Sequence, residues 1–265
     1  MRAFILAGGL GSRLRPLVNH VPKVMAPLRG RPFLEYQLFW LKKNGIWEVV
    51  LCTGYLGEVI EACFGRGESF GLKLYYSKEK IPLGTAGALK NAAAYVDGTF
   101  LVLNGDTLIA IELSSFLSFH RQKTGLATLA LALTEQPGSC GQVVVDQEAR
   151  IVAFLEKSHT SLSGQLVNAG LYLMEPKILV HIPAQQCSSL ELEIFPRLAR
   201  RLELFAFSVD TSFIDIGTPE NYLRAQNEIG RFCERTLRNL LPQEVNTERS
   251  YEKNGSIFGS GRNSN

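Results

Sequence analysis

A glycine-rich loop followed by basic residues is the first feature of this sequence that could do chemistry. Gly8, Gly9 and Gly11 lie within four residues of one another. Glycine backbone can approach an anion closely and donate its N–H groups to phosphate oxygens. The stretch between residues 2 and 31 holds no acidic residue and four Lys or Arg residues, Arg13, Arg15, Lys23 and Arg29. This pattern favours a polyphosphate ligand, but a tight turn with solvated arginines explains the loop and the basic run equally well.

The loop departs from both common nucleotide-binding motifs. In the dinucleotide fingerprint a third glycine would follow Gly9 and Gly11, and Leu14 stands at that position. In the Walker motif a Gly-Lys-Ser/Thr sequence would close the loop, and none is present here. The loop therefore argues against the two most frequent nucleotide-binding folds.

Two aspartates are candidate ligands for a divalent metal ion. Asp106 follows the apolar run 100–103, at the carboxyl end of a predicted parallel strand, where ligands collect in open α/β sheets. Asp215 lies within a second apolar run, 213–216. Mg²⁺ usually takes one or two carboxylates together with phosphate oxygens. The alternatives are a turn-forming aspartate after Gly105 and a cap of the helix that follows Asp215.

Composition excludes several classes of protein. The 265 residues are 46% apolar and 20% charged, with 28 basic against 25 acidic side chains, so we expect no nucleic acid partner. Five cysteines without a CxxC pair indicate neither a disulfide framework nor a zinc site. The apolar run at the N-terminus is too short for a signal peptide, and no other run approaches ~18 residues. We therefore expect a soluble, cytoplasmic protein that does not bind a membrane.

The first half of the chain predicts a parallel sheet that could position these residues. Short apolar runs typical of buried strands recur at residues 3–7, 48–53, 72–77 and 100–104, with helical patterns between them. This alternation predicts an α/β fold in which helices connect parallel strands. Leu34, Leu38 and Leu41 form the stripe of an amphipathic helix in the first connection, with Glu35 off the stripe. Gly45 stands where a helix C′ glycine belongs.

The second half predicts a more mixed arrangement. Strand-like segments with few helices between them occur at 127–133, 142–145, 151–155 and 166–174, and we expect antiparallel strands around a cleft. Residues 210–230 return to a strand and then a helix, for which Thr218 is the expected N-cap and Pro219 the first residue. The polar segment 242–265 is expected to be a flexible tail.

Taken together, these motifs resemble the signature of the sugar-1-phosphate nucleotidylyltransferases. The matching sequence is Leu-Ala-Gly-Gly-Leu-Gly-Ser-Arg-Leu-Arg-Pro-Leu at 6–17 and Val-Pro-Lys-Val-Met-Ala-Pro at 21–27. Later family motifs match in order at 83–88, 103–106, 154–157, 167–172 and 213–218, so that the resemblance covers roughly residues 1–230. It implies a Rossmann-like, three-layer α/β/α fold with a mixed, mostly parallel sheet of the nucleotide-diphospho-sugar transferase type. We expect a single domain over 1–241, with a nucleotide half at about 1–125 and a sugar-phosphate half at about 126–241.

The resemblance also implies a catalytic set. Arg13 and Lys23 match the basic residues that grip the triphosphate and stabilise the transition state, and Asp106 completes the expected catalytic residues. Asp106 and Asp215 match the metal aspartates, so the expected cofactor is Mg²⁺. The expected nucleotide-binding residues are Leu6, Ala7, Gly8, Gly9, Gly11, Arg13, Lys23, Gly84 and Thr85. Within this set, Gly84 and Thr85 match the turn that reads the edge of the base.

A second set of positions matches the sugar-phosphate side of the family. Lys157 matches the lysine that binds the phosphate of the sugar, and Glu156 matches the acid that accepts sugar hydroxyls. Asn168, Gly141 and Asn104 match further positions of this pocket. Without the resemblance, a Glu-Lys pair at a strand end is more often solvated surface.

Segments 32–37, 84–87, 104–107, 189–191 and 194–196 are most similar to one subfamily, the D-glycero-D-manno-heptose 1-phosphate guanylyltransferases. The expected partners are an NTP, with GTP favoured, and a sugar 1-phosphate; a homo-oligomer is compatible with the sequence. The reaction would supply an NDP-sugar for a surface polysaccharide or glycoprotein. It would proceed by direct attack of the sugar phosphate, since no Cys/His arrangement supports a covalent intermediate.

Two alternatives stay open. The first is another member of the family, such as a mannose-1-phosphate guanylyltransferase or a glucose-1-phosphate thymidylyl-, uridylyl- or cytidylyltransferase. The second is a non-catalytic homologue that binds a nucleotide sugar and regulates a partner. A regulatory homologue has no need of two metal carboxylates, so the joint presence of Asp106 and Asp215 favours an enzyme.

Overall fold

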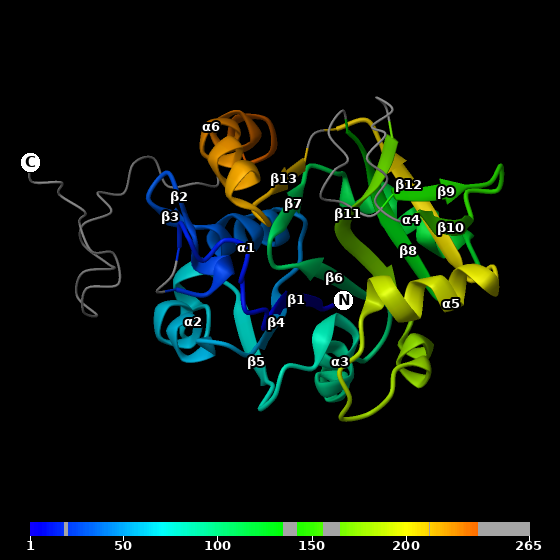
Figure 1. Ribbon diagram of the computed structural model, residues 1–265, viewed down its shortest axis with the longest axis horizontal. Helices are drawn as coiled ribbons and strands as arrows, with labels where there is room; N and C mark the ends of the chain where they lie inside the picture. The colour runs from blue at the N-terminus through cyan, green and yellow to red at the C-terminus, as the bar shows by residue number, and fades with distance from the viewer. Residues whose placement is uncertain (19–20, 135–141, 156–164, 212, 238–265) are drawn as a thin grey trace, which may run out of the picture.

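The computed structural model describes residues 1–18, 21–134, 142–155, 165–211 and 213–237 (Figure 1). Within that part of the chain, a central sheet of nine strands carries both halves of the molecule. Four neighbouring strands form the parallel block expected from the first half: β6 (Phe100–Asn104), β1 (Ala3–Ala7), β4 (Glu48–Thr53) and β5 (Lys73–Lys78). The expected strand at 72–77 is shifted by one residue along the chain.

The strand β11 (Gln165–Met174) joins this block to the second half. It pairs antiparallel with β6 over its last four residues and also pairs antiparallel with β8 (Ala127–Thr134) and β9 (Gln142–Val145). The sheet is completed by β10 (Ile151–Leu155) beside β9 and by β12 (Leu204–Val209) beside β8. The expected antiparallel strands of the second half are therefore present, whereas β12 is a strand that the sequence did not predict.

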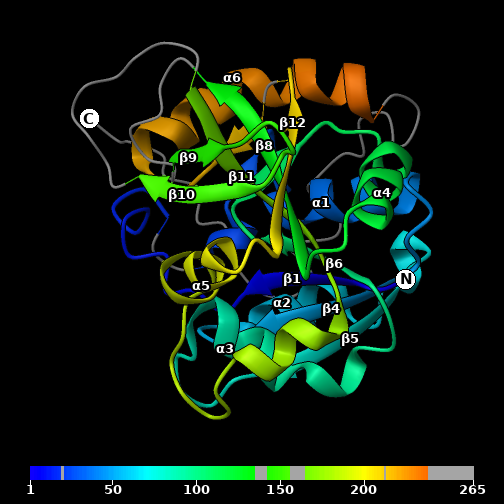
Figure 2. The same cartoon turned by 90° about the vertical axis from the view of Figure 1, so that its right-hand side faces the viewer.

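Helices cover both faces of the sheet. Successive residues of a strand point to opposite faces, and accordingly Ile5 packs in one hydrophobic core and Phe4 in the other. The first core receives apolar residues of α1 (Phe33–Lys43), α2 (Gly57–Phe64), α4 (Leu113–Gln122) and α6 (Pro219–Thr236), and the second those of α3 (Gly84–Asn91) and α5 (Phe195–Arg200). Figure 2 shows α3 and α6 on opposite sides of β1. The predicted three-layer α/β/α arrangement is confirmed.

The helix α1 is less amphipathic than its leucine stripe predicts. Every residue from Phe33 to Leu41 is buried, including Glu35, so the expected polar face is wrong. A short ribbon of β2 (Pro27–Leu28) and β3 (Arg31–Pro32) packs on the helix and pairs Arg31 with Glu35. Gly45 follows the helix with φ of +75°, as expected for a C′ glycine.

The remaining elements include a second small ribbon that matters for the site. β7 (Thr107–Ile109) follows β6 after the two residues Gly105 and Asp106, and β13 (Phe213–Asp215) pairs antiparallel with it. The helix α6 begins at Pro219, and the Thr218 hydroxyl accepts from the backbone N–H of Asn221 at 3.3 Å, so the predicted N-cap is confirmed. Short helical turns occupy Lys23–Met25, Glu68–Phe70, Ala93–Tyr95, Pro176–His181 and Leu190–Ile194.

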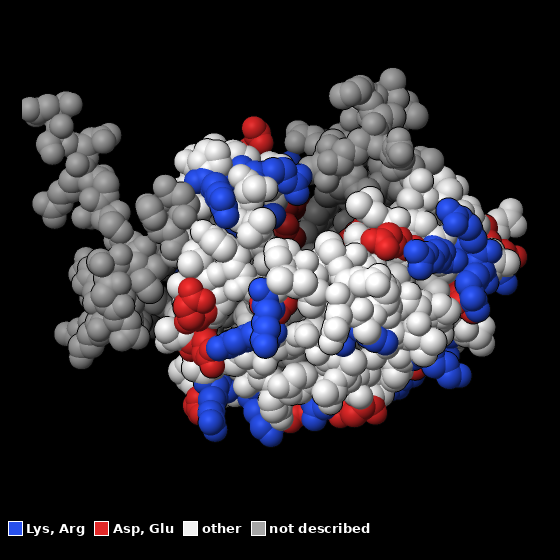
Figure 3. Space-filling view, turned by 60° about the horizontal axis from the view of Figure 1, so that its bottom comes forward, with Lys and Arg blue, Asp and Glu red and all other residues white. Residues whose placement is uncertain are grey.

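Within the described part of the chain, no helix is both long and apolar enough to cross a membrane. On the face shown in Figure 3, basic and acidic side chains are interspersed, so that face presents no continuous field of one sign.

A buried histidine between α4 and β8 makes the stability of the fold depend on pH. His120 Nδ1 lies 2.7 Å from the Thr128 hydroxyl, and Nε2 lies 3.1 Å from Glu175 Oε1. Burial lowers the pKa of His120 below its ordinary value, and the Glu175 carboxylate opposes that shift only in part. Below about pH 6.5 the unfolded chain therefore binds a proton at this imidazole more readily than the folded chain does, and the free energy of unfolding should decrease.

Urea unfolding at about pH 7.5 and about pH 5.5 measures this decrease. The variant His120→Asn should lose a part of it. His181→Asn is the matched control, because His181 is a half-exposed histidine on a short helical turn. Equal pH dependence in His120→Asn and the wild type would contradict the assignment.

Candidate active site

A cleft of about 410 Å³ lies at the carboxyl ends of β1 and β6. It is bounded by the glycine-rich loop after β1, by the turn that begins α3 and by the loop after β6. The residues predicted from the sequence that line it are Leu6, Ala7, Gly8, Gly9, Gly11, Arg13, Lys23, Gly84, Thr85, Asn104 and Asp106. The structure thus brings the whole predicted nucleotide set together with Asn104 and Asp106 from the end of β6.

The glycine-rich loop turns sharply at Gly11. Its φ of +60° is a conformation that glycine adopts without strain, and the backbone N–H of Leu14 closes the turn by donating to Gly11 O at 2.9 Å. A Cβ on Gly11 would lie 3.1 Å from the Cβ of Lys23, so the loop packs closely against that residue. Arg13 is exposed on the loop and forms no ion pair with the residues that the structure describes. Its guanidinium is available to a ligand in the cleft.

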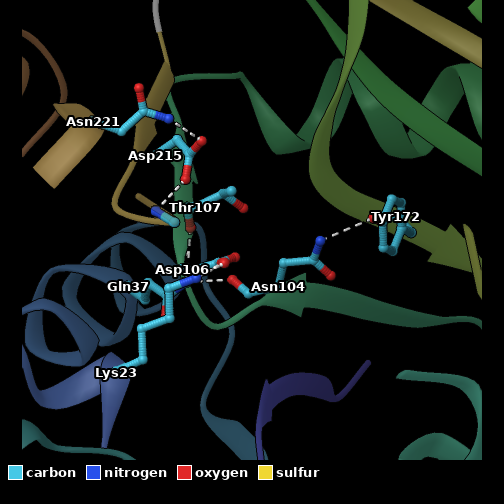
Figure 4. Close-up of polar contacts among 9 residues, drawn as sticks. Lys23, Gln37, Asn104, Asp106, Thr107, Tyr172, Asp215 and Asn221 are labelled. Atoms are coloured by element: carbon cyan, nitrogen blue, oxygen red, sulfur yellow. Dashed lines mark hydrogen bonds and ion pairs between the residues drawn. The ribbon is translucent and has the colours of Figure 1, made fainter. Parts of the chain in front are cut away.

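The two predicted metal aspartates meet where β7 and β13 pair. Asp215 is the register partner of Thr107, the residue after Asp106, and the backbone N–H of Ile216 donates to Asp106 O at 2.9 Å. Asp215 is 8% exposed; its Oδ1 accepts from Gly217 N and its Oδ2 from Asn221 Nδ2, both at 2.6 Å (Figure 4). Burial, and then the charge of Asp106, raise the pKa of Asp215 above its ordinary value. The two carboxylates therefore interact electrostatically.

A buried glutamine and a glycine hold the Asp106 loop in place. Gln37 of α1 donates from Nε2 to the backbone oxygens of Asn104 and Thr107, each at 2.8 Å. It thereby connects the two ends of the loop that carries Asp106. A Cβ on Gly105 would lie 2.4 Å from Leu6 O, so the loop can cross the end of β1 only with glycine there. Gln37 was not predicted as a site residue, because its position on α1 carries no sign of the contact.

Lys23 supplies the positive charge next to the carboxylates. It begins the short helical turn Lys23–Met25, and its ammonium group forms an ion pair with Asp106 Oδ2. Figure 4 shows its side chain directed at Asp106. Only 14% of the side chain is exposed, so the charge acts with weak solvent screening. In this arrangement Lys23 compensates part of the negative charge of the two aspartates.

The donor set fits Mg²⁺ bound together with a phosphate ligand. Mg²⁺ prefers oxygen ligands and is usually held by one or two carboxylates and by substrate phosphates. Asp106 and Asp215 provide two carboxylates, and no group of three or more His, Cys, Asp or Glu residues gathers elsewhere within the described part of the chain.

The predicted sugar-phosphate residues are brought together only in part. Asn104 lines the cleft, and Asn168 lies behind it on β11; both donate from Nδ2 to the hydroxyl of Tyr172, at 3.2 and 3.0 Å. Gly141, Glu156 and Lys157 lie outside the described residues, as does the predicted tail at 242–265. Their assignment stays a prediction.

The turn at Gly84 and Thr85 is built by contact with the segment that precedes α5. Gly84 has φ of +70°, and a Cβ there would lie 2.5 Å from Ser188 O. The Thr85 hydroxyl donates to Glu191 Oε2 at 2.7 Å and accepts from Leu190 N at 2.8 Å. Thr85 lines the cleft, but its hydroxyl is engaged within the protein, so a base would meet the backbone of this turn.

Glu79 is a cleft residue that was not predicted from the sequence. It is half-buried, lines the cleft, and lies so close to Gly8 that a Cβ there would be 2.3 Å from Glu79 Oε1. The hydrogen bond that the described residues make to its carboxylate comes from Leu83 N to Oε2, at 3.1 Å. Burial raises the pKa of Glu79 above its ordinary value. The signal that could have found it is the one used for Asp106, since Glu79 directly follows the parallel strand β5.

The sequence is similar to a known family and to named proteins within it. The model of the family described as "Nucleotidyl transferase" matches residues 2–231. The chain is 40% identical over 232 residues to the mannose-1-phosphate guanylyltransferase of Mycobacterium tuberculosis, covering 86% of this chain and 64% of that protein, or just under two thirds of its length. It is 36% identical over 233 residues to the D-glycero-alpha-D-manno-heptose 1-phosphate guanylyltransferase of Aneurinibacillus thermoaerophilus, covering 88% of this chain and 100% of that protein.

A solved structure shares the fold over most of the chain. HddC from Yersinia pseudotuberculosis, complexed with GMP-PN, superposes with a TM-score of 0.75 at 28% identity, covering 86% of this chain and 99% of that chain. The fold expected from the motifs at 6–17 and 21–27, that of the nucleotide-diphospho-sugar transferases, is confirmed by this similarity.

Proposed function

The chain belongs to the nucleotidyl transferase family, and from that premise we propose that it transfers a nucleoside monophosphate from an NTP to a sugar 1-phosphate and releases pyrophosphate. The observation that carries the proposal is the convergence in one cleft of the glycine-rich loop with exposed Arg13 and of Lys23 paired with Asp106. The buried Asp215 lies behind them, where the charge of Asp106 acts on it. Such a site can neutralise two polyanions and hold them in line.

In this reaction the basic residues and backbone N–H groups of the cleft would bind phosphate, and the acidic residues would bind the metal ion. Backbone N–H groups of the loop and the guanidinium of Arg13 would bind phosphate oxygens, the latter in a bidentate manner. Lys23, which pairs with Asp106, would be drawn to the phosphate chain when an NTP enters. Asp106 and Asp215 would hold Mg²⁺, whose charge, once bound, stabilises the phosphate oxygens in the transition state. An oxygen of the sugar phosphate then attacks the α-phosphorus as the bond to the β-phosphate bridging oxygen breaks.

We further propose that the nucleotide is GTP. The two relatives above are named as guanylyltransferases, and the HddC structure is a complex with GMP-PN. Glu79 supplies a physical reason, because its carboxylate lies in the cleft beside Gly8 and next to the turn at Gly84. Guanine presents two adjacent N–H donors, on N1 and N2, which one carboxylate can accept together. Uracil and thymine present a single N–H between two carbonyl acceptors, which a carboxylate would repel.

The variant Glu79→Gln should therefore reduce base discrimination. The ratio of kcat/KM for GTP to that for UTP should fall about tenfold, since a bidentate contact to a base contributes about 1–3 kcal/mol of discrimination. Glu58→Gln is the matched control, because Glu58 is exposed on α2 outside the cleft. An unchanged GTP to UTP ratio in Glu79→Gln would contradict a base-reading role.

The sugar is proposed to be D-glycero-D-manno-heptose 1-phosphate, with mannose 1-phosphate as the nearest competitor. The Aneurinibacillus relative, whose whole length the match covers, supports the heptose, and the M. tuberculosis relative supports mannose. A matrix of four NTPs against several sugar 1-phosphates, scored by Mg²⁺-dependent pyrophosphate release, tests the reaction and both substrates. Binding of nucleotide without pyrophosphate release in any pair would instead support the non-catalytic, regulatory alternative.

A further inference from the structure

The hydroxyl of Tyr172 forms the centre of a polar network behind the cleft. Tyr172 lies on β11 and is fully buried. Its oxygen accepts from Asn104 Nδ2 at 3.2 Å and from Asn168 Nδ2 at 3.0 Å, and its proton is donated to Glu191 Oε1 at 3.4 Å. A tyrosine hydroxyl has one proton and two acceptor lone pairs. These three contacts therefore use the full hydrogen-bonding capacity of the group.

The charge of Glu191 sets the direction of every bond in this network. An ionised carboxylate only accepts hydrogen bonds, so Tyr172 has to donate to it and can only accept from the two amides. Burial, and then the charge of Glu191, raise the pKa of Tyr172 well above its ordinary value, so the hydroxyl keeps its proton. As a result, each asparagine turns its NH₂ group toward Tyr172.

This orientation leaves an acceptor in the wall of the cleft. With Nδ2 of Asn104 on Tyr172, as Figure 4 shows, Oδ1 has to point elsewhere. Asn104 Oδ1 is buried and has no hydrogen-bond partner within the described part of the chain, although Asn104 lines the cleft. A buried acceptor without a donor is costly. A sugar hydroxyl would satisfy it once a shift of the Asn104 side chain brings Oδ1 to the cleft surface.

The opposite oxygen of Glu191 holds the nucleotide side of the cleft. Glu191 Oε2 accepts from the Thr85 hydroxyl at 2.7 Å and from the Ser189 hydroxyl at 3.0 Å. Thr85 belongs to the turn at Gly84 that lines the cleft beside Glu79. One carboxylate thus connects the turn expected to meet the base with the amides expected to meet the sugar.

We propose that Tyr172 and Glu191 are positioning residues of the transfer reaction. Tyr172 orients Asn104, which lines the cleft, for the sugar phosphate, and Glu191 couples that orientation to the turn at Thr85. Asn168, whose Oδ1 accepts from Gly170 N at 3.0 Å, holds the Tyr172 hydroxyl from a second side. Neither acts on the substrate directly in this assignment, since each works through the residues to which it is hydrogen-bonded. The inference rests on the proposed function, because it assigns the two ends of the network to the two substrates.

The variant Tyr172→Phe tests the sugar end. It removes the hydroxyl and keeps the ring, which packs edge-on against Phe195 with centroids 5.0 Å apart. The KM for the sugar 1-phosphate should rise about tenfold, the scale of lost hydrogen bonds to an oriented group. The dissociation constant of the NTP, measured by calorimetry without sugar phosphate, should stay within about twofold, because Glu191 still holds Thr85.

The variants Glu191→Ala and Glu191→Gln test the coupling. Glu191→Ala releases both ends, so the NTP dissociation constant and the KM for the sugar phosphate should both rise several-fold. Glu191→Gln keeps an acceptor for Tyr172 and should recover most of the sugar KM. Phe195→Leu is the control for stability, because it removes ring packing on Tyr172 and no hydrogen bond; it should lower Tm and leave both constants within about twofold.

Two results would overturn the inference alone: a wild-type KM for the sugar phosphate in Tyr172→Phe, or the same rise in KM in Phe195→Leu. A wild-type chain that releases no pyrophosphate with any sugar 1-phosphate overturns the proposed function, and the inference with it. The wild-type matrix therefore separates the two failures before any variant is compared.

Discussion

Asp106→Asn should lower turnover by a factor on the order of 10² or more, while Tm changes little. The change removes one of two carboxylates proposed to hold Mg²⁺ and also the anion that pairs with Lys23. Losing a metal carboxylate costs several kcal/mol of charge stabilisation in the transition state, which gives a rate effect of this order. The fold should tolerate the change, because the Asp106 side chain is 27% exposed and the loop is held through backbone atoms by Gln37 and Ile216.

Pyrophosphate release over a series of Mg²⁺ concentrations measures the loss. Calorimetry of Mg²⁺ with enzyme and NTP, after subtraction of the titration of Mg²⁺ into NTP alone, reports the metal at the site. Asp97→Asn is the control: Asp97 is a 63% exposed carboxylate that pairs with Arg2, which precedes β1 at the end of the sheet away from the cleft. Turnover of Asp106→Asn close to that of Asp97→Asn would show that Asp106 holds no metal.

Arg13→Ala should lower kcat/KM for the NTP about 10- to 100-fold. Arg13 is exposed in the cleft without an ion-pair partner among the described residues, so its guanidinium is free to take two phosphate oxygens at once. Hydrogen bonds to charged groups contribute about 1.5–3 kcal/mol each, which sets this range. Arg13→Lys should recover only part of the loss, because an ammonium group cannot form the bidentate contact.

Arg15→Ala is the matched control for Arg13. Arg15 lies on the same loop and is exposed, but its guanidinium stacks over the Tyr55 ring at 5.0 Å from the centroid and does not line the cleft. The variant Arg15→Ala should lower kcat/KM for the NTP only a few-fold, because it weakens the positive potential around the loop without removing a direct contact. Equal losses in the two alanine variants would mean that the loop acts by its net charge and that Arg13 has no specific contact.

The parallel block of the sheet was predictable because its strands are short apolar runs buried on both faces. Phe100–Asn104 carries the signal fully: four apolar residues, then the polar residue at the carboxyl end where the cleft lies. The strand β12 was missed because only a short basic and acidic turn separates it from the end of α5 at Arg200, and because its pairing partner, β8, lies about 75 residues earlier in the chain. A sequence pattern does not report a pairing over that separation.

The residues of the candidate site also divide into those that a local sequence motif predicts and those that it does not. Arg13, Lys23, Asp106 and Gly84 lie in local motifs, and the structure places all four around one cleft. Gln37 and Glu191 act through contacts with residues far away in the chain, such as the one between Glu191 and Thr85. Glu79 did have a local signal, its place directly after β5. The polar face expected for α1 was wrong for a related reason. Glu35 is buried because the ribbon of β2 and β3 packs on α1 and Arg31 pairs with this glutamate, and these contacts cannot be predicted from the sequence of α1 alone.

The pairing of β11 with β6 as well as with β8 and β9 limits how this chain could be recombined with its relatives. A crossover near residue 125, between the two halves, would give β6 a β11 of different origin. Leu171–Met174 would then have to fit Phe100–Leu103 on both faces of the sheet, residue by residue. Gly170 adds a further constraint, because a Cβ there would lie 2.2 Å from the Thr107 hydroxyl. For a designer of chimaeric enzymes, the portable unit is therefore β6, β7 and β11 together, although about 60 residues of chain separate them.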